Sequence, residues 1–201
     1  MRIAGPSKLL LVLLVASIFG GSSTASAQFF GTRKPKTTVT KLISRQAPAR
    51  IDQSIEPLIN PGNSHVLISL SKQRAYLMVG EDVYIDTPIS SGKRNSTPTG
   101  TFRISEKDAD HRSNIYGDFV DSRGRTVRSG VSTKIDSAPS GTRYRGAPMK
   151  WFMRLTSGGV GMHVGILPGY PASHGCIRLP ADIAPLIYQK VKLGTTTVIE
   201  P

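Results

Sequence analysis

From about residue 64 onward, the chain alternates short apolar runs with turn residues. Seven of these runs predict β-strands, at 65–70, 74–79, 82–87, 101–105, 151–156, 160–164 and 195–199. Gly80 and Glu81 predict the turn between the second and the third strand. Because each run is short and is bounded by turn residues, the pattern favours an antiparallel β-sandwich or barrel.

One segment has the signals of a helix. Pro180 stands at its start, residues 181–192 form its body, and Gly194 marks its end. Pro185 falls after the first turn, so it either weakens this helix or begins a second helical piece. The chain is therefore expected to be mainly β, with one or two short helices.

Residues 106–149 differ from the rest of this region. Strand periodicity is weak there, and charged residues and glycines are frequent. A long polar stretch inside a compact domain is usually a functional loop. We expect an insertion that forms a lid over a substrate site, with a disordered excursion as the alternative.

The first 27 residues have the pattern of a targeting segment. Arg2 and Lys8 precede an apolar run at 9–19, and the small residues Ala-Ser-Ala follow at 25–27. At about 1.5 Å per residue, this run spans roughly 16 Å, about half of the hydrocarbon core of a bilayer. The pattern predicts a cleaved secretory signal over 1–27 rather than a membrane anchor. An exported, periplasmic protein without a membrane span after cleavage is expected.

Export changes which partner the positive charge of the chain is expected to bind. The full sequence has 26 basic and 13 acidic residues, a net charge of +13, and the hydrophobic content of 38% suffices for a packed core. Residues 28–60 are basic, contain several prolines and show little periodicity, which predicts a flexible basic arm. An exported chain does not meet chromosomal DNA. An anionic cell wall or membrane surface is therefore the expected partner, and a solvated surface without a specific partner is the alternative.

Cys176 is the only cysteine, which excludes an intramolecular disulfide framework. Two histidines, an arginine and several glycines lie near it, within 161–178. The residues allow a buried thiol that acts as a small apolar group, a zinc site with His163 and His174, or a nucleophile activated by an imidazole. The first interpretation does not explain the crowding of polar residues, and the second has unusual spacing and no evident fourth ligand. The pattern favours a Cys–His nucleophile.

Two strings of residues resemble one known family. The Ser-His-Gly-Cys-Ile-Arg-Leu string at 173–179 resembles the signature of the L,D-transpeptidase catalytic domain, a bacterial family that modifies peptidoglycan. The Ser-Thr-Pro-Thr-Gly-Thr-Phe string at 96–102 resembles a second recurring segment of that family, and residues 66–92 resemble its opening hairpin. The resemblance implies a β-sandwich-like catalytic domain, placed at 61–201, with the cysteine at a cleft and with no cofactor or metal.

The resemblance also implies a reaction. The cysteine attacks the carbonyl between meso-diaminopimelate and the terminal D-alanine of a peptidoglycan tetrapeptide stem, and D-alanine leaves. The acyl group then passes to an amine of another stem, which gives a 3→3 crosslink. With water as acceptor the same site would be an L,D-carboxypeptidase, and with a protein lysine it would attach or release a wall-anchored lipoprotein. A wall-binding module with a vestigial site is the non-enzymatic alternative.

The resemblance assigns roles to the residues of the motif. Cys176 is the nucleophile and His163 matches the general base. The backbone amides of Gly175 and Cys176 match the oxyanion hole, with His174 beside them. Ser173 is expected to order the turn before the cysteine.

Three further residues are expected near the substrate. Arg178 matches the last polar residue of the motif, which helps to order the site, and a substrate carboxylate is a candidate partner for it. Tyr170 lies in the Pro-Gly-Tyr-Pro loop at 168–171 and is expected to line the cleft. His111 lies in the expected lid and is a candidate substrate contact, with exposure to solvent as the alternative.

Overall fold

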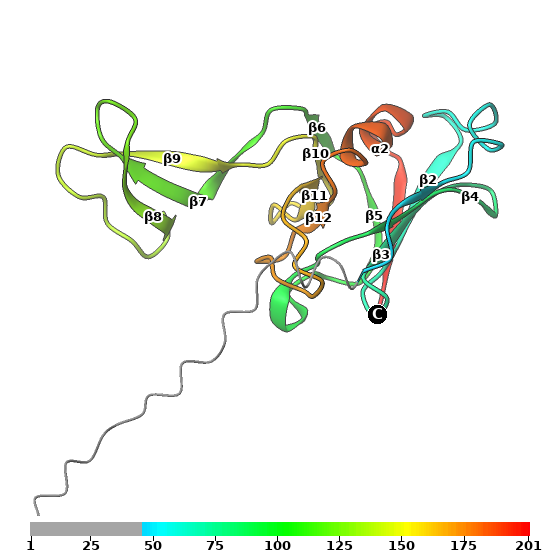
Figure 1. Cartoon of the computed structure of the whole chain (residues 1–201), viewed down its shortest axis with the longest axis horizontal. Helices are drawn as coiled ribbons and strands as arrows, with labels where there is room; N and C mark the ends of the chain where they lie inside the picture. The colour runs from blue at the N-terminus through cyan, green and yellow to red at the C-terminus, as the bar shows by residue number, and fades with distance from the viewer. Residues whose placement is uncertain (1–45) are drawn as a thin grey trace, which may run out of the picture. The chain divides into compact units, whose positions relative to one another are not determined.

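The computed structural model describes residues 46–201, which form three β-sheets (Figure 1). The six-stranded sheet has the order β1 (Arg50–Ile51), β4 (Asp82–Pro88), β3 (Arg74–Val79), β2 (Ser64–Ser69), β13 (Thr196–Glu200) and β5 (Gly100–Arg103). The four-stranded sheet has the order β12 (Ile177–Leu179), β11 (Gly161–Val164), β10 (Phe152–Arg154) and β6 (Glu106–Asp108). The third sheet has the order β8 (Thr126–Ser132), β7 (Arg112–Val120) and β9 (Arg143–Pro148). The helical elements are the 3₁₀ turn η1 (Lys93–Asn95) and the helix α2 (Ala184–Lys190).

The expectation of a mainly β fold is confirmed. The seven predicted strands correspond to β2, β3, β4, β5, β10, β11 and β13. The helix is shorter than predicted, because Pro185 lies in its first turn, where a residue without an N–H group is tolerated. Within residues 46–201, no helix is long and apolar enough to cross a membrane. The predicted signal segment at 1–27 and residues 28–45 of the predicted arm lie outside the described residues.

One hydrophobic core joins the six-stranded sheet, the four-stranded sheet and α2. On β2, buried Val66 and Ile68 alternate with half-buried positions, as expected for a strand that packs one face on a core. The other members of the core include Leu77, Ile85, Met153, Met162, Ile177, Leu179, Ile187 and Ile199. These two sheets therefore form the layered architecture that the apolar runs predict.

Two strand pairs are parallel, which corrects the predicted antiparallel arrangement for these strands. β13 runs parallel to β2, and β11 runs parallel to β12. β12 was not predicted, because its Ile-Arg-Leu sequence is too short to show an alternating pattern. The loop at 165–176 carries the chain back to the start of β12, so that the two strands can run in the same direction.

The insertion expected at 106–149 is not a strandless loop. β7 pairs with β8 and β9 to form an antiparallel sheet, which Figure 1 draws apart from the other two. Most of β8 is exposed, and both pairings contain register shifts. Because few positions of this sheet are buried, its sequence lacks the alternation of apolar and polar residues that reveals a strand.

The predicted flexible arm does not extend over its last fifteen residues. Arg50 and Ile51 pair with β4, and Ile59 is buried in the core. The Arg74 guanidinium donates to the Asp86 carboxylate at 2.7 Å and to the carbonyl of Ala47 at 2.6 Å. The few apolar residues of this stretch are enough to seat it on the edge of the six-stranded sheet, although they show no periodicity.

Lys107 of β6 links two parts of the core. Its ammonium donates to the carbonyls of Tyr188 and Val191, each at 2.6 Å, at the C-terminal end of α2. Lys107→Met keeps the apolar stem and removes both bonds, so we expect the free energy of unfolding to fall by about 1–2 kcal/mol. Lys150→Met is the control, because the Lys150–Asp110 pair is exposed and should be worth less than about 0.5 kcal/mol. Urea unfolding measures both, and equal losses would contradict the assignment.

Candidate active site

The parallel pairing of β11 with β12 places the predicted base, His163, on the strand beside the one that follows the predicted nucleophile, Cys176. His163 is the register partner of Arg178, and Met162 is the partner of Ile177. Met162 and Ile177 are fully buried in the core. Because side chains alternate along a strand, His163 and Arg178 lie on the opposite face. Cys176 directly precedes β12.

His163 is buried and has a defined tautomer. Its side chain is 8% exposed, and Nδ1 lies 2.7 Å from the carbonyl oxygen of Val164. A carbonyl only accepts hydrogen bonds, so Nδ1 carries the proton and Nε2 keeps its lone pair. The pKa of His163 is lowered from 6.5 to about 4, mainly by burial; the bond to Val164 opposes this shift, and the charges of Arg178 and His111 add to it. At neutral pH the ring is therefore an uncharged base.

The thiol of Cys176 is partly buried and uncharged at rest. Its Sγ donates to the carbonyl of Gly159 at 3.6 Å. Burial raises the pKa of Cys176, and the Gly161 amide and the charges of Arg178 and Arg154 offset only part of this effect. The resting site thus holds a neutral thiol and a neutral imidazole rather than a thiolate–imidazolium pair. It suits a mechanism in which the imidazole takes the proton while the sulfur attacks.

The turn before Cys176 is tied by the hydroxyl of Ser173. This hydroxyl donates to the carbonyl of Cys176 at 2.5 Å and accepts from the amide of Gly175 at 3.0 Å. The Gly175 N–H, which the resemblance assigns to the oxyanion hole, is used inside the turn in this structure, and its role toward a substrate stays a prediction. The Cys176 N–H donates to no residue among 46–201, which leaves it free for a substrate oxygen.

His174 stacks on a residue from the inserted sheet. The ring of Tyr116, on β7, lies 4.2 Å from the ring of His174 with an angle of 11° between the planes. Burial is the main cause that lowers the pKa of His174, with Lys93 and Arg178 adding to it. The insertion thus touches the catalytic motif itself, two residues before the cysteine.

Arg178 forms no salt bridge with an acidic residue among the described residues. Its guanidinium makes a long contact, 3.4 Å, with the carbonyl of Ile166. A Cβ on Gly165 would lie 2.6 Å from the Cγ of Arg178, so glycine makes room for this side chain. An unpaired, half-buried guanidinium is suited to an anionic group of a substrate.

His111 lies near the site. It is partly buried, whereas the alternative interpretation of the sequence expected it to be exposed to solvent. It stacks on Phe152 at 4.2 Å, and Phe152 lies 6.5 Å from the ring of His163. The Nδ1 of His111 lies 3.1 Å from the carboxylate of Asp108. His111 therefore supports the aromatic wall beside the base.

Residues that could hold a metal lie beside this wall. Glu106, Asp108 and His111 bring their ligand atoms within 4.8 Å of one another, but Glu106 is already bonded to Arg154 and Asp108 to His111. The zinc alternative required His163, His174 and Cys176 to gather their ligand atoms. Those three side chains do not form such a group in the described part of the chain.

Tyr170 is about half exposed, and its carbonyl accepts a hydrogen bond from Ser90 at 2.8 Å. This bond fixes the loop between β11 and β12 to the end of β4. The aromatic ring thus stands on an anchored backbone, beside the segment that leads to the motif.

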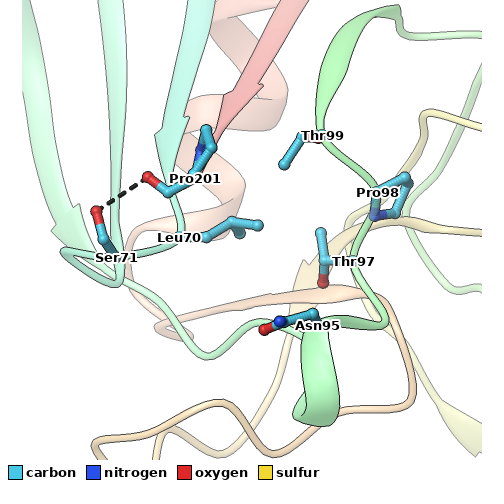
Figure 2. A pocket seen from close by; sticks show the side chains of 7 residues that line it. All are labelled: Leu70, Ser71, Asn95, Thr97, Pro98, Thr99 and Pro201. Carbon is cyan, nitrogen blue, oxygen red and sulfur yellow. Dashed lines mark hydrogen bonds between the residues drawn. The ribbon is translucent and has the colours of Figure 1, made fainter.

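The Ser-Thr-Pro-Thr segment at 96–99 contacts the motif. The hydroxyl of Thr97 donates to the carbonyl of Gly175 at 2.7 Å. Thr97 also lines a cavity of about 510 Å³, and Figure 2 shows its side chain near Pro98 and Asn95, with Leu70 and Pro201 across from it. A second cavity, of about 450 Å³, borders Gly165 and Ile166. Neither cavity is lined by any of the predicted site residues.

Sequence reasoning missed Tyr116 and the part played by Thr97. Thr97 belongs to the Ser-Thr-Pro-Thr-Gly-Thr-Phe segment at 96–102, but the sequence of this segment does not show which backbone group its hydroxyl binds. Tyr116 gave no signal, because its partner in the stack is far away in the sequence.

The pKa of His163 makes a prediction for acid stability. Since its folded value of about 4 lies below the ordinary 6.5, the unfolded chain binds a proton between these pH values that the folded chain does not. The native protein should lose stability as the pH falls through this window, by roughly 3 kcal/mol more than His163→Gln at pH 4. Urea unfolding at neutral pH and at pH about 4 tests this. Equal acid losses in the two proteins would show that His163 is not held neutral.

Comparison with known proteins places this site in a family. A family model for the L,D-transpeptidase catalytic domain matches residues 63–199, and no curated protein matches the chain. The fold is similar to an L,D-transpeptidase from Mycobacterium smegmatis, with 24% identity, a TM-score of 0.52 and coverage of 69% of this chain and 59% of that one.

Two further solved structures are similar at the level of the fold. An L,D-transpeptidase from Xylanimonas cellulosilytica gives 21% identity, 69% and 60% coverage and a TM-score of 0.50. LD transpeptidase LdtMt1, in complex with imipenem, gives 22% identity, coverage of 69% of this chain and 59% of that one, and a TM-score of 0.51. The chain spans about three fifths of the length of these proteins. Since the family model covers most of the chain, including both strings, the protein belongs to the L,D-transpeptidase catalytic-domain family.

Proposed function

We propose that the protein is an exported peptidoglycan L,D-transpeptidase that acts through a Cys176 acyl-enzyme. The observation that carries the proposal is the neutral, buried His163, which lies on the strand that pairs with β12, and β12 begins directly after Cys176. The charge of Arg178 acts on the pKa of both side chains. An uncharged base and an uncharged thiol are suited to attack on a carbonyl, where the proton must leave the sulfur as the new bond forms.

The first half-reaction follows from these groups. The sulfur of Cys176 forms a bond to the carbonyl carbon between meso-diaminopimelate and D-alanine, and its proton passes to Nε2 of His163. The carbonyl oxygen becomes negative and accepts a hydrogen bond from the Cys176 amide. When the C–N bond breaks, the electron pair stays on the nitrogen of D-alanine, which takes the proton from His163. A thioester and neutral His163 remain.

The second half-reaction returns the enzyme to its starting state. An acceptor amine attacks the thioester carbonyl and passes its proton to His163, and the C–S bond breaks to give the Cys176 thiol. With the side-chain amine of a diaminopimelate from another stem, the product is a 3→3 crosslink. Water in the same place gives carboxypeptidase activity, and a protein lysine gives attachment of a lipoprotein or, in reverse, its release.

The positive charge of the chain is compatible with an anionic stem-peptide substrate and with a location at the cell wall. The net charge is +13, and Arg178 presents a guanidinium at the site that no described carboxylate neutralises. A stem peptide carries carboxylates, so such a guanidinium favours its binding. Export to the periplasm, expected from the signal pattern at 1–27, would bring the enzyme to this anionic wall.

The three-stranded insertion is proposed to act as a lid over the bound stem. The stack of Tyr116 on His174 is the contact that supports this role, since it joins the insertion to the residues beside the nucleophile. A lid that excludes water would favour an amine acceptor over hydrolysis.

Removal of the thiol tests the proposed reaction. Cys176→Ala should form neither crosslinked dimers nor free D-alanine from purified tetrapeptide muropeptides, because no acyl-enzyme can form. Mass spectrometry should show one imipenem adduct on the native protein and none on Cys176→Ala. Lys72→Ala, on an exposed turn, is the matched control and should behave as the native protein. Crosslinking by Cys176→Ala would refute the proposal, and the product masses distinguish crosslinked dimer, tripeptide and protein-linked acceptor.

Substitution of Tyr116 tests the lid. Tyr116→Ala removes the stack on His174 and should raise the KM for the stem peptide by about 2- to 10-fold, since such aromatic pairs contribute about 0.5–1.5 kcal/mol. Tyr116→Phe keeps the stack and should retain the native KM. Steady-state release of D-alanine gives both constants. A native KM for Tyr116→Ala would rule out a role of this stack in substrate binding.

A further inference from the structure

Thr97 joins two backbone segments behind the nucleophile. Its side chain is buried, and its hydroxyl has two partners at 2.7 Å: it accepts from the amide of Gly92 and donates to the carbonyl of Gly175. Because the Gly92 amide can only donate, the hydroxyl proton must point at Gly175. Thr97 therefore has one hydrogen-bonded orientation.

We propose that Thr97 is a positioning residue that aims the amide of Cys176 at the oxygen of the reacting carbonyl. This assignment rests on the acyl-transfer function proposed above. The carbonyl of Gly175 and the N–H of Cys176 belong to one peptide unit, and the described chain contains no cis peptide bond. In a planar trans unit these two groups point in opposite directions. A bond that fixes the Gly175 oxygen on one side thus fixes the Cys176 N–H on the other.

No other described side chain holds this peptide unit. The hydroxyl of Ser173 binds the amide of Gly175 and the carbonyl of Cys176, which belong to the preceding and the following peptide units. Gly175 has a φ of +143°, a conformation that side chains rarely adopt, and glycine offers little resistance to rotation of the unit. Without the Thr97 hydroxyl, the unit between Gly175 and Cys176 would be free to tilt.

The surrounding backbone is built to bring Thr97 to this place. A Cβ on Gly92 would lie 2.9 Å from the Cα of Gly175, so only glycine allows the two segments to come this close. Pro98 restricts Thr97 to extended backbone angles, and the β-branched side chain has few rotamers. Figure 2 shows Thr97 on the segment that leads from η1 to β5, next to Pro98. The backbone and rotamer restrictions thus fix the position of the Thr97 hydroxyl before substrate binds.

The experiment compares two reactions of the same thiol. Acylation by imipenem develops a negative oxygen and needs the aimed amide, whereas alkylation by iodoacetamide attacks a saturated carbon and does not. Removal of one oxyanion-hole donor costs about 10²–10³ in rate, so misdirection should cost part of that. Thr97→Val, of nearly the same shape, should acylate about 10- to 100-fold more slowly and alkylate within about 2-fold of the native rate. Thr97→Ser should restore acylation to within about 3-fold of the native rate.

Thr197→Val is the matched control, because Thr197 is fully buried on β13 and its hydroxyl has no partner among residues 46–201. It should leave both reactions unchanged. If Thr97→Val does not fold, Thr97→Ala repeats the comparison with the same expected result. Native acylation by the hydroxyl-free variant, or an equal loss in acylation and alkylation, would overturn the assignment. A native protein that imipenem does not acylate would instead refute the proposed function and this assignment with it.

Discussion

The parallel contact between β11 and β12 is the constraint on which the site depends. One face of this pair is anchored by Met162 and Ile177 in the core, and the other face carries His163 and the residues around Cys176. Each strand is short, so the register is set by the burial of these apolar side chains. A shift of one residue would turn His163 into the core and Met162 to the opposite face of the pair. The packing of the domain therefore decides which side chains can react.

Burial acts on both reactive groups in the same sense. It lowers the pKa of the His163 imidazole and raises the pKa of the Cys176 thiol, because each charged form is poorly solvated there. Arg178 favours the thiolate but opposes the imidazolium, so it does not stabilise an ion pair. The charge separates only when a substrate supplies a carbonyl that can share it. In the proposed reaction, the thiol would therefore stay protonated until a substrate binds.

Alternation of apolar and polar residues predicts the strands that pack on the core, and the motif around Cys176 predicts the nucleophile. Both are local signals. β12 was missed because three residues cannot display a period, and the inserted sheet was missed because both of its faces are largely polar. The sequence also cannot show that the Ser173 hydroxyl accepts from the Gly175 amide, because it does not reveal how the turn closes. The stack of Tyr116 on His174 joins segments that only the folded chain brings together.

The hydrogen bonds of the turn before Cys176 leave the N–H of Cys176 without a partner among residues 46–201. Buried backbone groups almost always find a partner, and an unpaired one costs about 1–3 kcal/mol. The hydroxyls of Ser173 and Thr97 satisfy the Gly175 amide and the carbonyls of Gly175 and Cys176, but no described group accepts from the Cys176 N–H. The fold thus leaves the backbone donor of the cysteine itself available. An oxygen that becomes negative there gains a hydrogen bond whose geometry is already in place, and the gain is largest when the charge is fully developed.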